Sequence, residues 1–204
     1  MTDPGPHESR HDVRGAAWVL VACVAFGAAM EAVKSETGFG YAFRSDVGNW
    51  SALWLVLPLV MGYQFRRPLP GALGGVAATM SALVGFYVVN AVIFPQPGGL
   101  ADTVTTFTHI MARWALFGLV SGPVFGAAGT RLRSVSGLAL VSGVVMVLEP
   151  LVLDLWSGRR LPLPEPLAIS WWFEWRSAAT VEVLLGALLV VLATRRRVAR
   201  RGAR

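Results

Sequence analysis

An apolar stretch about as long as a bilayer is thick constrains this chain more than any other feature of its sequence. It runs from Thr108 to Gly129 and reads THIMARWALFGLVSGPVFGAAG. In a helix its glycines at positions 118, 122 and 126 share one face, which lets a neighbouring helix approach to backbone contact. Arg113 lies about 140° around that helix from the first of these glycines. We therefore expect a central helix with a close helical partner on one side and an ionic partner on another.

The composition indicates a polytopic membrane protein, because 54% of the 204 residues are hydrophobic and only 15% are charged. The single cysteine, Cys23, excludes a disulfide framework and a cysteine-based metal site, and we expect neither a metal nor another cofactor. The formal net charge is +6. However, the basic residues are spread over loops and one tail without a nucleic-acid-binding motif, so we expect no nucleic acid partner.

Six apolar runs predict an all-α fold, a polytopic membrane bundle of six transmembrane helices within one domain at 14–194. A disordered polar tail at 1–13 and a basic cytoplasmic tail at 195–204 flank this domain. A cleaved signal peptide is the alternative for the first run, but the acidic residues before it and its length argue against cleavage. The predicted spans are 15–33, 47–65, 69–94, 108–129, 135–156 and 176–193.

The distribution of basic residues predicts the orientation in the membrane. Six spans place both termini on one side, and that side carries twelve basic residues, six of them in the C-terminal tail. The other side carries five. Because cytoplasmic loops are enriched in lysine and arginine, we expect both termini in the cytoplasm. The expected location is the bacterial inner membrane, with the lipid bilayer as a partner.

With this orientation, polar side chains fall in the outer parts of all six predicted spans. An unpaired charge in hydrocarbon costs several kcal/mol, so these groups should face one another or water. We therefore predict an outward-facing polar and aromatic pocket between the helices. Its candidate ligand-binding residues are Glu31, Asn49, Trp54, Tyr87, Asn90, His109, Arg113, Trp114, Glu149 and Glu182, and its candidate catalytic acids are Glu149, Glu182 and Asp154. Alternatively, Arg113 only neutralises Glu149 or Glu182 and holds the helices together without a ligand.

Four motifs resemble an uncharacterised family of small bacterial integral membrane proteins, of the domain-of-unknown-function class. They are NWSALW at 49–54, FY at 86–87, RWALFGLVSGPVFGAAG at 113–129 and the step Glu149-Pro150. The resemblance extends over most of the chain. It implies a six-helix membrane domain and brings no known activity, substrate or catalytic residue.

Three functions from different classes are compatible with the predicted pocket. The first is a binding component for a small or lipophilic molecule, similar to the substrate-binding subunits of vitamin transporters, which requires an energising partner subunit. The second is a membrane-embedded enzyme that uses a buried Glu149, Glu182 or Asp154 as general acid on a prenyl or other lipid substrate, as in terpene cyclisation. The aspartate-rich diphosphate motif of membrane prenyltransferases is absent from the sequence. The third is an accessory structural subunit of a membrane complex.

Overall fold

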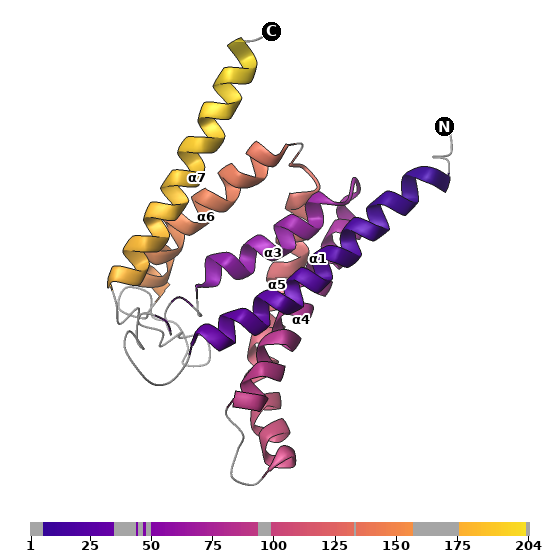
Figure 1. Ribbon diagram of the computed structural model, residues 1–204, viewed down its shortest axis with the longest axis vertical. Helices are drawn as coiled ribbons and strands as arrows, with labels where there is room; N and C mark the ends of the chain where they lie inside the picture. The colour runs from indigo at the N-terminus through magenta and orange to yellow at the C-terminus, as the bar shows by residue number, and fades with distance from the viewer. Residues whose placement is uncertain are drawn as a thin grey trace. The chain divides into compact units, whose positions relative to one another are not determined.

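The computed structural model describes residues 6–34, 44, 47, 50–93, 99–132, 134–156 and 176–202. Within these ranges the chain is helical and contains no strand, which confirms the all-α class predicted from the sequence (Figure 1). Six helices are described: α1 (Pro6–Val33), α3 (Ser51–Tyr63), α4 (Pro68–Ile93), α5 (Leu100–Gly129), α6 (Val135–Trp156) and α7 (Arg176–Gly202).

Two stretches of the described chain, Gly15–Val33 and Pro68–Ile93, are long and apolar enough to cross a membrane. The other apolar stretches within the described residues are shorter, so two of the six predicted spans reach membrane length there. Helix α3 has 13 residues, which extend over only about 20 Å. Among the residues whose side chains are described, the apolar stretch of α5 is Trp114–Gly129 and that of α6 is Val135–Pro150.

Three helices extend further than the predicted spans. Helix α1 begins at Pro6 and so includes most of the segment predicted to be a disordered tail; proline is favoured in the first turn because its missing N–H is not needed there. Helix α5 begins at Leu100, where Asp102 lies in the first turn and stabilises the positive end of the helix dipole. Helix α7 continues to Gly202 through the basic segment, whose arginines suit the negative end of that dipole.

The chain divides into two compact units. The first unit is Met1–Ser35 with Trp54–Arg133, and the second is Glu36–Leu53 with Ser134–Arg204. Helices α1, α4, α5 and most of α3 therefore belong to the first unit, and α6, α7 and the first residues of α3 belong to the second.

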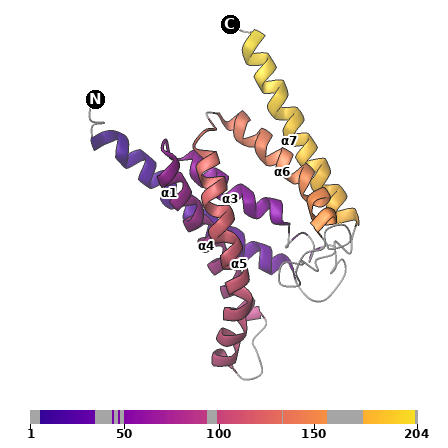
Figure 2. The same ribbon diagram turned by 180° about the vertical axis from the view of Figure 1, so that it is seen from behind.

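In the first unit α4 packs against both α1 and α5 (Figure 2). The contact with α1 is made at backbone distance through Gly27 and Gly85. A Cβ atom on Gly27 would lie 2.7 Å from the carbonyl carbon of Ala82, and one on Gly85 would lie 2.9 Å from the carbonyl carbon of Val24. Neither glycine can carry a side chain without moving one of the two helices.

The glycine stripe of α5 packs against α4, which confirms the close helical partner predicted from the sequence. A Cβ atom on Gly122 would lie 3.0 Å from both the nitrogen and the Cα of Val76. One on Gly126 would lie 3.0 Å from the Cα of Gly75, and one on Gly118 would lie 2.6 Å from a methyl group of Thr79. All three glycines are buried.

In the second unit α6 and α7 run in opposite directions and pack together (Figure 1). Their backbones meet at Gly143 and Gly186. A Cβ atom on Gly143 would lie 2.6 Å from the carbonyl oxygen of Gly186, and one on Gly186 would lie 2.7 Å from that of Gly143. This contact fixes which residues face one another further along the helix pair.

Candidate functional site

Two glutamates face each other across the α6–α7 pair. Counted from the contact between Gly143 and Gly186, Glu149 lies six residues further along α6 and Glu182 lies four residues back along α7. At about 1.5 Å per residue the antiparallel helices bring both to a similar level, and the two carboxyl groups interact directly. Glu149 is 7% exposed and Glu182 is 0% exposed. The unit therefore holds two adjoining carboxyl groups out of water.

The carboxyl group of Glu149 is held by the beginning of α3. Its Oε2 accepts a hydrogen bond from the backbone N–H of Ala52, the second residue of that helix. The first four N–H groups of a helix have no partner within the helix, and negative charge is stabilised beside them. This bond fixes the position of Glu149 in the second unit.

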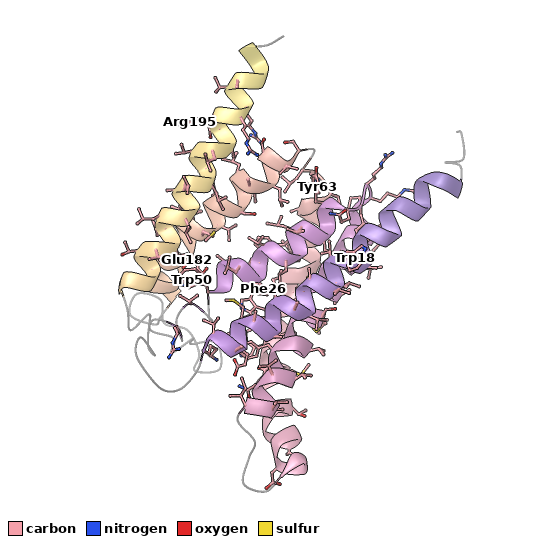
Figure 3. The ribbon with its side chains drawn as sticks, viewed as in Figure 1. Trp18, Phe26, Trp50, Tyr63, Glu182 and Arg195 are labelled. Carbon is pink, nitrogen blue, oxygen red and sulfur yellow. The ribbon has the colours of Figure 1, made fainter. Side chains whose placement is uncertain are left out.

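Glu182 has no comparable support. Both of its carboxyl oxygens are buried, and neither makes a hydrogen bond of good geometry in the part of the chain that the structure describes. Trp50 of the same unit is 5% exposed, and its indole N–H also lacks an acceptor there. Figure 3 shows Trp50 and Glu182 close together in projection. Buried polar groups are nearly always hydrogen-bonded, so these two side chains are exceptions among the described residues.

Glu31 forms a second acidic site in the first unit, where one carboxyl oxygen is hydrogen-bonded and the other faces an ammonium group. It is 1% exposed and accepts a hydrogen bond from the side-chain amide of Asn90, which joins α1 to α4. The ammonium group of Lys34 lies 3.5 Å from its other oxygen. The same ammonium group lies 4.9 Å from the ring centroid of Phe86, within the range of a cation–π interaction. The charge of Glu31 is therefore balanced within the unit.

Four aromatic rings pack next to Glu31 with edge-to-face geometry. The ring centroids of Phe26 and Trp54 are 5.6 Å apart, as are those of Trp54 and Phe86, and those of Phe86 and Tyr87 are 5.3 Å apart. Tyr87 is 8% exposed, and its phenol interacts electrostatically with Glu31. The first unit thus brings together four of the predicted site residues: Glu31, Trp54, Tyr87 and Asn90.

The remaining candidate residues lie elsewhere or outside the described part of the structure. Trp114 in α5 packs on Phe117 with a centroid separation of 5.9 Å. His109 and Arg113 belong to α5 and Asp154 to α6, but their side chains, and all of Asn49, lie outside the described residues. The ion pair between Arg113 and Glu149 or Glu182 therefore stays a prediction.

Three contributors were not predicted from the sequence as parts of a site. Lys34 is one of the five basic residues on the side opposite the termini, and its position three residues after Glu31 places both side chains on one helix face. Trp50 was noted only as part of a motif, and the backbone N–H of Ala52 has no sequence signal. Among the described residues, no group of three or more histidine, cysteine, aspartate or glutamate side chains is arranged to hold a metal ion.

These features define an all-α protein with two apolar stretches of membrane length and acidic side chains buried between its helices. Residues 42–203 match the Family of unknown function (DUF6518), and the chain belongs to this family. The match confirms the resemblance to an uncharacterised family that the sequence motifs indicated. Neither the curated proteins nor the solved structures contain a match to the chain.

Proposed function

We propose that this is a multi-pass membrane protein that binds a small or lipophilic molecule at Glu149 and Glu182, as a binding component of a transport system would. The observation that carries the proposal is the fully buried carboxyl group of Glu182, which adjoins the carboxyl group of Glu149 and makes no hydrogen bond of good geometry among the described residues. A buried donor or acceptor without a partner costs about 1–3 kcal/mol. A ligand that donates hydrogen bonds to Glu182 would remove this cost, and the free energy recovered would strengthen its binding.

The surface of the helices supports the membrane location. In the two membrane-length stretches only 22% and 33% of the apolar window is buried, so most of these side chains face outward. Soluble proteins rarely leave such continuous apolar surface uncovered, whereas lipid tails would cover it. Exposed apolar side chains on the other helices include Leu116, Val120 and Val124 of α5, Val144, Leu148 and Val152 of α6, and Leu184, Leu188 and Val191 of α7.

The orientation with both termini in the cytoplasm predicts the labelling of introduced cysteines. In a Cys23→Ala background, Asp102→Cys should react with an impermeant thiol reagent in intact cells, and Val198→Cys should react only after the cells are opened. Both positions are exposed in the structure, so a difference in labelling reports the side of the membrane. Labelling of Val198→Cys alone in intact cells would reverse the orientation.

Native mass spectrometry of the detergent-purified protein tests the binding site. We expect the wild type to carry a co-purified adduct that is lost from Glu182→Gln, because the amide turns one acceptor oxygen into a donor. Glu31→Gln changes a buried carboxyl group of the first unit in the same way and should keep the adduct. A wild type without any adduct, or an adduct that Glu182→Gln retains, would contradict binding at this site.

A further inference from the structure

We propose that the C-terminal part of α7 binds the headgroup of an anionic phospholipid, such as phosphatidylglycerol, through three consecutive arginines. These are Arg195, Arg196 and Arg197, here called the arginine collar, and all three are exposed. This inference rests on the membrane location proposed above and is independent of ligand binding at Glu182. The course of α7, the placement of the arginines on it and the charges around them support it.

Helix α7 continues well beyond its apolar sequence. It runs without a break from Arg176 to Gly202, so the arginine collar is held at fixed angles by a regular helix. Its 27 residues extend over about 40 Å, whereas the hydrocarbon layer of a bilayer is about 30 Å thick. The charged end of α7 therefore reaches the level of the lipid headgroups.

Arg195 continues the exposed apolar face of α7. It lies seven residues after Leu188 and eleven residues after Leu184, and at about 100° per residue both steps return to the same face within about 20°. The two leucines are 52% and 63% exposed. A phospholipid whose acyl chains cover these leucines therefore carries its phosphate next to Arg195.

The collar also extends over the end of α6. Arg197 lies eleven residues after Gly186, the glycine that contacts α6, and so lies on the side of α7 that faces α6. Helix α6 begins at Val135, eight residues before Gly143, which corresponds to position 194 of α7. The collar therefore begins where α6 no longer covers α7, and Figure 3 shows Arg195 at about the level at which α6 begins.

No acidic residue of the helix pair lies near the collar. Helix α7 contains no aspartate or glutamate after Glu182, and α6 contains none before Glu149. Glu182 precedes Arg195 by thirteen residues, or about 20 Å along the helix. Arg200 and Arg201 follow in the same helix, which gives five positive charges within seven residues. Such a charge attracts anions, and the guanidinium group binds two phosphate oxygens side by side.

The test is native mass spectrometry of the full-length protein in detergent with equal amounts of phosphatidylglycerol and phosphatidylethanolamine. We expect the wild type to retain phosphatidylglycerol in preference, because the ethanolamine headgroup has no net charge. Combining Arg195→Gln, Arg196→Gln and Arg197→Gln should weaken phosphatidylglycerol about tenfold or more, the effect of one lost charge-assisted hydrogen bond. Lysine at the same three positions keeps the charge and should keep most of the affinity.

The control removes two exposed arginines of the first unit, through Arg66→Gln with Arg67→Gln, and should keep the lipid preference. An equal loss in the control, or no preference in the wild type, would overturn the collar as a lipid site. Displacement of the lipid by millimolar inorganic phosphate would replace it with a site for free anions. The preference of the wild type needs no variant, so the inference can fail even if the glutamine variant does not insert.

The same spectra separate this inference from the proposed function. Glu182→Gln should keep the bound phosphatidylglycerol, and the glutamine variant of the collar should keep the adduct that depends on Glu182. Loss of lipid preference with a Glu182-dependent adduct would leave the binding function standing. A lipid preference without that adduct would leave only the collar.

Discussion

Replacing Gly122 by leucine is expected to lower the melting temperature of the detergent-purified protein by roughly 10 °C, which corresponds to about 3 kcal/mol of lost stability. The first carbon of the new side chain would already lie 3.0 Å from the backbone of Val76 and 3.1 Å from that of Gly75. These are backbone atoms of α4, which cannot turn away as the end of a side chain can. The two helices must therefore separate and lose the close packing that holds membrane helices together.

The matched control is Ala128→Leu in the same helix. Ala128 is exposed, whereas Gly122 is buried against α4. The control adds a similar volume to α5 but should leave the melting temperature within about 2 °C of the wild type, as surface substitutions usually do. Equal melting temperatures for the two variants would mean that the stripe does not pack against α4 in the folded protein.

The contact between α4 and α5 could be predicted because it depends on a local pattern. Glycines four residues apart lie on one face of any helix, whatever surrounds it. The partner helix was not part of that pattern. The partner is fixed by Gly71 and Gly75 of α4. A Cβ atom on either of these glycines would clash with the backbone of Gly126. A sequence shows that a helix has a face for close packing, but the identity of its partner depends on the folded chain.

For the acidic residues, too, the sequence predicts burial but does not identify the partner of each side chain. Their burial could be predicted because a charged group within an apolar run must leave the lipid. Glu31 and Asn90 were predicted to lie at similar depth, and the structure joins them by a hydrogen bond. Glu149 and Glu182 were predicted to line one pocket, with an ion pair to Arg113 as the alternative, and the structure places the two glutamates beside each other. Which side chains meet depends on the register of α6 against α7, which the contact between Gly143 and Gly186 sets.

Asn90→Leu is expected to destabilise the first unit through Glu31, with a loss of about 1–3 kcal/mol. Leucine has nearly the same size as asparagine but cannot donate, so the carboxyl group of Glu31, which is 1% exposed, loses its bond to α4. Lys34 compensates only in part, because its side chain is 25% exposed and the solvent weakens an ion pair. The melting temperature in detergent should fall by roughly 3–10 °C.

The double variant Glu31→Leu with Asn90→Leu separates the cost of a lost bond from that of an unsatisfied carboxylate. Replacing both partners by apolar groups removes the polar atoms along with the bond, which is nearly neutral for stability. The double variant should therefore melt above Asn90→Leu, although it carries one more substitution. Asn90→Asp should melt lowest of all, because it places a second carboxylate against Glu31. If the double variant melts below Asn90→Leu, then Glu31 stabilises the unit through Lys34 rather than through Asn90, and the link to α4 is the contact of the Lys34 ammonium group with the ring of Phe86.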